Sequence, residues 1–166
     1  MDLPSNDTTA LATDFRDCIA LLNAHQVVFV LVGGFAVGWH GVVRATGDID
    51  FLYEQSPRNV RRLCRALEEF GAPAQLIDAD FLLSPNAVTQ IGNVPLRIDL
   101  MASISGVSFE QVRAGAVESA IAEQHLLIIG LDELRVNKRA TGRVKDKEDL
   151  RRLTQVSKRA KRSKTR

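Results

Sequence analysis

The sequence is poor in cysteine, with only Cys18 and Cys64 among its 166 residues. Two isolated cysteines are too few for a disulfide framework or a zinc site. We expect both to be small core residues of a reduced, cytoplasmic protein. The chain also lacks an apolar run of the roughly 18 residues that a membrane span requires. Residues 1–4 are acidic and polar, unlike a secretory signal, so we expect no association with a membrane.

Several common catalytic and nucleotide-binding motifs are absent as well. The pattern G-x-G-x-x-G of dinucleotide-binding folds does not occur. No Gly-Lys-Ser or Gly-Lys-Thr follows the glycine pair, so the chain has no Walker loop. The three histidines and two cysteines form no pattern that supports a Ser-His-Asp or Cys-His nucleophile. A phosphate site would therefore have to be built in another way.

The charge of the chain is unevenly distributed. The net charge is +2, but residues 157–166 carry six basic side chains and no acid, so the rest of the chain carries −4. We predict a single domain over residues 1–155 and a basic, disordered tail over residues 156–166. Such tails bind nucleic acid in some proteins. A solvated chain end without a partner is the alternative.

The hydrophobic pattern predicts a mixed α/β (α+β) fold, in which helices pack on a mixed β-sheet. Ser56 and Pro57 fit the start of a helix that ends at Gly71. Helices are expected at residues 8–24, 35–42, 56–70, 108–114, 131–139 and 146–154. Strands are expected at residues 27–32, 48–53, 88–94, 96–102, 117–121 and 125–129.

Three aspartates stand in predicted strands among apolar neighbours. Asp48 and Asp50 are two residues apart, so their side chains point to the same face of a strand. Asp99 lies in the middle of a later strand, where a carboxylate needs a partner. A shared Mg²⁺ site would satisfy all three, since magnesium prefers carboxylate oxygens, phosphate and water. Alternatively, the aspartates face solvent or pair with a basic neighbour such as Arg44 or Arg97.

A glycine pair, Gly33-Gly34, directly follows the apolar strand of residues 27–32. Glycines allow a sharp turn and a close approach of the backbone to a ligand. The helix that follows would offer free N–H groups to phosphate. An ordinary strand-to-helix turn needs glycine just as much, so the pair alone does not identify a nucleotide site.

Three further side chains are candidates for contact with a nucleotide. Lys138, in the predicted helix at residues 131–139, is a compact cation that could neutralise triphosphate as pyrophosphate leaves. An exposed helix lysine without such a role is the alternative. Arg44 and Thr46 come just before Asp48 and could contact phosphate or ribose, or could anchor the loop.

Taken together, these features resemble the DNA-polymerase-β-like nucleotidyltransferase superfamily. The signature of that superfamily is a Gly-Gly or Gly-Ser pair after a strand, then a strand with two acids one residue apart, and a third acid on a later strand. The positions that match this signature are Gly33, Gly34, Asp48, Asp50 and Asp99. The resemblance implies that the three aspartates bind metal and are catalytic.

Within that superfamily the sequence resembles one branch, the AbiEii-type and related uncharacterised small nucleotidyltransferases. The likeness covers residues 26–153 and is carried by residues 32–37, 44–50, 134–140, 143–146 and 149–150. In that branch a lysine, here Lys138, faces the nucleotide site. The matching residues that recur beside it are Arg143, Lys145 and Asp146.

The resemblance implies an enzyme that uses one or two Mg²⁺ ions. It would transfer a nucleoside monophosphate from an NTP such as ATP to RNA, a protein or a small molecule. In some relatives this activity is the toxin of a toxin–antitoxin system, which implies an antitoxin partner protein. The alternative is a non-catalytic nucleotide- or RNA-binding protein on the same fold, because 166 residues leave little room for an acceptor-binding domain.

Overall fold

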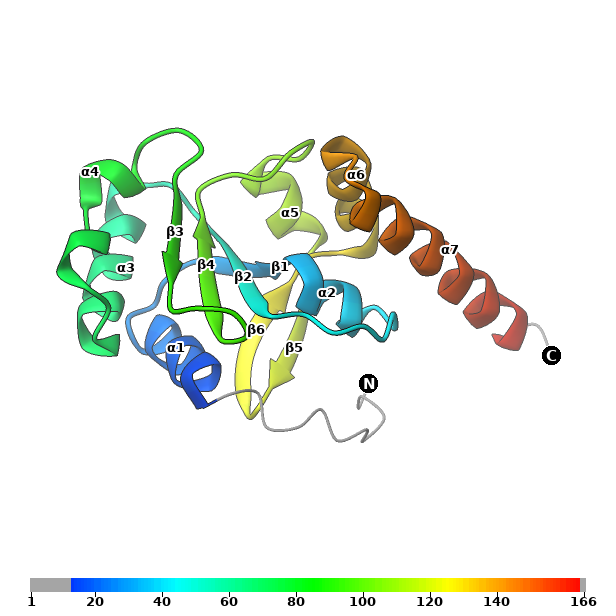
Figure 1. Ribbon diagram of the computed structural model, residues 1–166, viewed down its shortest axis with the longest axis horizontal. Helices are drawn as coiled ribbons and strands as arrows, with labels where there is room; N and C mark the ends of the chain where they lie inside the picture. The colour runs from blue at the N-terminus through cyan, green and yellow to red at the C-terminus, as the bar shows by residue number, and fades with distance from the viewer. Residues whose placement is uncertain (1–12, 165–166) are drawn as a thin grey trace.

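The computed structural model describes residues 13–164, so the first part of the predicted helix at residues 8–24 lies outside the described residues. Its centre is a six-stranded mixed sheet with the strand order β3-β4-β2-β1-β6-β5 (Figure 1). The strands are β1 (Phe29–Val32), β2 (Asp48–Tyr53), β3 (Val88–Ile91), β4 (Arg97–Met101), β5 (Val117–Ile121) and β6 (Gln124–Ile128). The predicted fold class is confirmed, and all six predicted strands are present.

Helices connect and cover the strands (Figure 1). The helices are α1 (Thr13–Ala24), α2 (Gly33–Trp39), α3 (Pro57–Phe70), α4 (Ala79–Leu82), α5 (Phe109–Gly115), α6 (Leu131–Thr141) and α7 (Val144–Lys164). A short 3₁₀ turn, η1 (Ala74–Leu76), precedes α4. The hydrophobic pattern did not predict η1 and α4, because segments this short contain too few apolar residues to show a period.

Helix α3 illustrates how local sequence sets the boundaries of an element. The hydroxyl of Ser56 accepts a hydrogen bond from the backbone N–H of Asn59 at 3.2 Å, and Pro57 fills the first helical position. Gly71 ends the helix in the left-handed region, with φ at 82°. The helix turns an apolar face to the core through buried residues that include Val60 and Leu63. Helix α1 packs against α3, and together they bury much of the core.

The two central strands of the site lie side by side in register. Strand β2 pairs with β1 in antiparallel fashion, which places Asp50 opposite Val32, the last residue before the glycine pair. Strand β2 also pairs with β4 in parallel fashion, which places Asp50 opposite Asp99. Segments far apart in sequence therefore meet at one place on the sheet.

The C-terminal helix differs from the expected disordered tail. Helix α7 continues to Lys164 and projects from the body of the protein (Figure 1). Val156 packs against the core, and Arg135 donates a hydrogen bond to the hydroxyl of Ser157 at 2.8 Å. Lysine, arginine and alanine are good helix formers, so a run of positive charge without glycine or proline can extend a helix that the core already holds.

Both cysteines are free, with Cys18 buried and Cys64 half-buried. Burial raises the pKa of the Cys18 thiol to about 12, which suits an inert core residue. Among the described residues, no helix combines the length and apolar character that crossing a membrane would demand.

Candidate metal and nucleotide site

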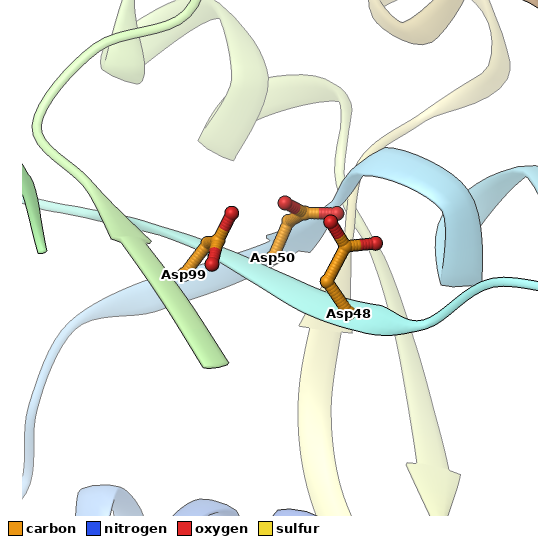
Figure 2. Close-up of side chains that lie close together, drawn as sticks. All are labelled: Asp48, Asp50 and Asp99. Carbon is orange, nitrogen blue, oxygen red and sulfur yellow. The ribbon is translucent and has the colours of Figure 1, made fainter. Parts of the chain in front are cut away.

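Asp48, Asp50 and Asp99 form one cluster, as the sequence predicted. Figure 2 shows the three carboxylates on the same side of the sheet, two from β2 and one from its neighbour β4. One carboxylate oxygen of each residue lies within 4.8 Å of those of the other two. The parallel register of β2 and β4 produces this convergence, because it sets Asp50 beside Asp99 while Asp48 shares their face.

The cluster concentrates negative charge in a sheltered place. Asp99 is buried, and Asp48 and Asp50 are half-buried. Burial, with added repulsion from the carboxylates of Asp48 and Asp99, raises the pKa of Asp50 to about 6. Closely spaced carboxylate oxygens with shared negative charge are the donor set that Mg²⁺ or Mn²⁺ prefers. The three aspartates therefore fit a divalent cation of this kind.

One arginine already contacts two of these carboxylates. Arg97 donates from Nη2 to Asp48 Oδ2 at 2.8 Å. It also donates to both oxygens of Asp99, from Nε at 2.7 Å and from Nη2 at 2.9 Å. Gln90, opposite Asp99 on β3, adds an amide donor to Asp99 Oδ2 at 3.3 Å. Of the two basic neighbours considered from sequence, Arg97 is the one that pairs with the aspartates.

The glycine pair is shaped around Asp50. Gly33 has φ at 66°, in the left-handed region, and a Cβ atom on it would overlap the Asp50 carboxylate. The backbone N–H of Gly34 hydrogen-bonds that carboxylate and partly offsets the rise in its pKa. A Cβ atom on Gly34 would lie 2.7 Å from the hydroxyl oxygen of Thr46 and 3.0 Å from Nη2 of Arg44. Packing against Asp50 and Thr46 thus explains why both positions are glycine.

Thr46 and Arg44 lie beside the aspartate cluster, as expected from their place before β2. The hydroxyl of Thr46 is 3.1 Å from both the backbone oxygen and Oδ1 of Asp48, so it helps to orient that carboxylate. Arg44 Nε lies 3.1 Å from Asp149 Oδ1 on helix α7, while its Nη2 lies over Gly34. Arg44 therefore links the glycine pair to the C-terminal helix.

Lys138 is buried in a charged network between α6 and α7. Its ammonium donates to Asp146 Oδ1 at 2.8 Å and pairs with Asp149 Oδ2 at 3.0 Å. Asp146 also accepts hydrogen bonds from Thr141 at 2.8 Å and from Arg143 at 2.7 Å. Only 5% of the lysine is exposed, so the alternative of an exposed helix lysine does not hold.

This network keeps Asp146 ionised in spite of its burial. Burial acts to raise the pKa of Asp146, but hydrogen bonds from Arg143, Lys138 and Thr141 hold it well below its usual value. The charge of Lys138 is also felt at Asp50, where it lowers the pKa of the carboxyl. Of the residues expected beside the lysine, Arg143 and Asp146 contact the network, while Lys145 is exposed.

Three side chains of the site were not assigned a role from sequence. The sequence pattern gave no role to Asp149 or Gln90, and Arg97 was considered only as an alternative partner of the aspartates. A signal for Arg97 was available, because it stands two residues before Asp99 and so shares its face of the strand. The positions of Asp149 and Gln90 depend on packing that local sequence does not reveal.

The sequence model of a family described as "Nucleotidyltransferase of unknown function (DUF6036)" matches residues 10–160. No curated protein matches the sequence. The likeness to the AbiEii-type branch stays a prediction.

Several solved structures share the fold. TM1012 from Thermotoga maritima, assigned as a nucleotidyltransferase, aligns with a TM-score of 0.57 at 15% identity, covering 85% of this chain and 90% of that one. The lincosamide antibiotic adenylyltransferase LnuA, bound to lincomycin, gives 0.57 at 13% identity, covering 87% and 97%. The antibiotic-resistance factor ANT(2'')-Ia gives 0.56 at 17% identity, covering 92% and 91%. At such low identity the likeness concerns the fold.

Proposed function

The chain belongs to the DUF6036 family of nucleotidyltransferases, and we propose that it transfers a nucleoside monophosphate from an Mg²⁺-bound NTP to an acceptor. The observation that carries this proposal is the cluster of Asp48, Asp50 and Asp99, whose oxygens lie within 4.8 Å of one another. Three carboxylates this close repel one another, which costs free energy. A structural ion pair would need only one of them, so the cluster favours a role in binding metal.

We assign one or two metal ions to the three aspartates. Bound Mg²⁺ would supply positive charge beside the reacting phosphate and its attacking oxygen. The protein holds each ligand in place by a separate contact. Thr46 orients Asp48, the N–H of Gly34 orients Asp50, and Gln90 contacts Asp99. These contacts pre-organise the carboxylates, which is how positioning contributes to such chemistry.

The NTP phosphates would lie near the cationic side chains next to the glycine pair. Arg44 is the best placed of these, since its Nη2 lies over Gly34. Its Nε forms an ion pair with Asp149, which fixes the side chain. We propose that Arg44 and Thr46 contact phosphate or ribose. Gly33 and Gly34 have no side chains, so we propose that the backbone approaches the nucleotide closely there. Lys138 would add positive charge from within its network as pyrophosphate leaves, rather than as a free side chain.

The proposed reaction is an in-line displacement at the α-phosphorus. An acceptor hydroxyl oxygen forms a bond to the α-phosphorus, and its proton passes to a carboxylate of the aspartate cluster. The bond from the α-phosphorus to the bridging oxygen breaks, and pyrophosphate leaves with that electron pair. Catalysis in this class rests mainly on positioning and electrostatic stabilisation.

The acceptor would be RNA, a protein or a small molecule. Lys158, Arg159 and Arg162 are exposed on the projecting end of α7, which favours RNA because it presents positive charge to a polyanion. A small molecule is the alternative, since the LnuA structure of similar fold contains lincomycin. From the resemblance to AbiEii-type enzymes we also infer a toxin role with an antitoxin partner. From the two free cysteines we infer a cytoplasmic location.

Labelled nucleotides test the proposal directly. The protein is incubated with each α-³²P-labelled NTP, Mg²⁺ and total RNA or a cell lysate, and label on macromolecules or small products is measured. We expect transfer with the wild type and at least a hundredfold less with Asp48→Asn/Asp50→Asn. Nucleotide binding without any transfer would favour the non-catalytic binding protein, and the absence of both would reject a nucleotide site.

A further inference from the structure

Arg97 lies against two of the three aspartates of the cluster. Its planar guanidinium bridges the two strands, with Nη2 bonded to Asp48 on β2 and both Nε and Nη2 bonded to Asp99 on β4. About a quarter of its side chain is exposed, while Asp99 is almost fully covered. Arg97 therefore binds Asp99 through two parallel hydrogen bonds, one to each carboxylate oxygen. This bidentate geometry is the strongest that an arginine and a carboxylate form.

This arrangement uses oxygen atoms that a metal ion needs. Both oxygens of Asp99 and Oδ2 of Asp48 accept hydrogen bonds from Arg97, and Oδ1 of Asp48 is next to the hydroxyl of Thr46. A divalent cation close to the same oxygens would lie next to a fixed positive charge. At such short separation in a partly buried site, like charges repel strongly. Metal and guanidinium thus compete for Asp48 and Asp99.

A nucleotide triphosphate would change that balance. Phosphate oxygens accept a guanidinium fork as readily as carboxylates do, so arriving phosphates offer Arg97 a second partner. They also bring negative charge for the metal ion to share. Within the cluster, Arg97 donates its hydrogen bonds to Asp48 and Asp99. Asp50 accepts a hydrogen bond from the backbone of Gly34 instead, so a move of Arg97 toward phosphate would free Asp48 and Asp99.

We propose that Arg97 is the built-in cation of the metal-free site, and that it gives up Asp48 to a divalent metal only when nucleotide phosphates are present. Arg97 is then a positioning residue that couples the binding of metal to the binding of nucleotide. This inference rests on the proposed function. It predicts that metal alone binds weakly, because it must displace Arg97, whereas the metal–nucleotide complex binds well.

Removing the guanidinium tests the idea without any activity measurement. Isothermal titration calorimetry measures the affinity of Mn²⁺ alone for the wild type, Arg97→Met and Arg97→Lys. We expect Arg97→Met to bind Mn²⁺ about tenfold more tightly than the wild type, within the usual range of coupling between two ligands. Arg97→Lys should lie between them, because one ammonium cannot bridge both carboxylates. It also serves as the test variant should Arg97→Met fail to fold.

Arg151→Met is the matched control. Arg151 donates two hydrogen bonds to the carboxylate of Glu148, from Nε at 2.9 Å and from Nη2 at 2.7 Å. This pair resembles that of Arg97 but lies on the exposed surface of α7. Its loss should leave the Mn²⁺ affinity as in the wild type. An affinity of Arg97→Met and Arg97→Lys for Mn²⁺ within twofold of the wild type overturns the inference, because Arg97 would then not compete with metal.

A second titration separates this inference from the proposed function. Preformed Mn²⁺–AMPCPP, a complex with a non-hydrolysable ATP analogue, is titrated into the wild type. Binding of the complex together with unchanged Mn²⁺ affinity in the Arg97 variants overturns only the role of Arg97. Failure of the wild type to bind the complex overturns the nucleotide site and this inference with it.

Discussion

The carboxylate of Asp50 packs against Gly33, in the space that a side chain at residue 33 would occupy. The glycine pair and strand β2 therefore depend on each other. Asp50 can hold its place in the cluster only because residue 33, in the turn after β1, has no side chain. The sequence suggested that the glycines serve phosphate. Their packing indicates that they first serve to seat the aspartate, and that Gly34 does so through its N–H.

Replacement of Gly33 should damage both the fold and the site. Gly33→Ala places a methyl group on the Asp50 carboxylate and forces alanine into the left-handed region. We expect the free energy of unfolding to fall by about 1–3 kcal/mol, measured by urea denaturation, and the Mn²⁺–AMPCPP affinity to fall as Asp50 is displaced.

Gly38→Ala is the control for this substitution. Gly38 lies on the same helix, is exposed, and has open space where a Cβ atom would be. Alanine there should raise stability by about 0.5–1 kcal/mol, because glycine is the poorer helix former. Equal effects of the two substitutions would show that Gly33 has no special contact with Asp50.

Loss of Lys138 should destabilise the protein more than loss of an exposed lysine. Lys138→Met leaves the buried carboxylates of Asp146 and Asp149 without their ammonium. We expect the free energy of unfolding to fall by about 3–5 kcal/mol, as for other broken buried pairs. Lys147→Met, an exposed position on α7, should change it by less than about 0.5 kcal/mol. A stability loss no larger than that of Lys147→Met would mean that Lys138 has no structural role.

Metal affinity should depend on pH through Asp50. A carboxyl group must lose its proton to bind metal, and the pKa of Asp50 is raised to about 6, first by burial and then by Asp48 and Asp99. Mn²⁺ affinity should therefore fall by up to about tenfold per pH unit below pH 6 and level off above it. An ordinary aspartate, with a pKa near 3.9, would give no change between pH 5 and 7.

The same raised pKa fixes the sign of a stability effect. Because Asp50 binds its proton more tightly in the folded state than in the unfolded state, the metal-free protein loses stability as pH rises through about 6. Mn²⁺ should restore that stability at pH 7. Asp50→Asn should abolish both pH effects, and thermal unfolding between pH 5 and 7 measures them. A wild-type profile as flat as that of Asp50→Asn would contradict the raised pKa.

The basic end of α7 should contribute to RNA binding if RNA is the acceptor. Replacing Lys158, Arg159 and Arg162 with glutamine removes three exposed positive charges. The slope of log affinity against log salt for a single-stranded RNA should decrease by about 2, at roughly 0.7 per phosphate contact. The control removes three exposed arginines from α3: Arg58, Arg61 and Arg65. The same slope for both triple variants would remove α7 from the acceptor site.

Much of the site could be predicted because its signals are local. The alternation in residues 48–53 indicates a strand with both aspartates on one face, and the isolated acid of residues 97–101 marks the third carboxylate of the cluster. The boundaries of α3 follow from its serine cap, its first-turn proline and its terminal glycine. These features depend on neighbours within a few residues, so periodicity and capping rules suffice.

The remainder depends on distant packing. Arg97 and Asp48 are 49 residues apart and meet only because β2 and β4 pair in parallel. Lys138 is buried because α7 packs against α6 with Asp146 and Asp149 toward the lysine. The sequence of neither helix predicts this packing. The helical course of residues 156–164 likewise follows from the anchoring of Val156 and Ser157 on the body.

The most direct test of the aspartate cluster as a metal–nucleotide site is a crystal of the wild-type protein with Mn²⁺ and AMPCPP, measured by anomalous diffraction. The account predicts a manganese peak bonded to carboxylate oxygens of Asp48, Asp50 and Asp99 and to phosphate oxygen, at about 2.0–2.2 Å as for similar hard cations. Bound nucleotide with the metal elsewhere, or Asp48 and Asp99 still bridged by Arg97 with no peak among the three aspartates, would contradict it.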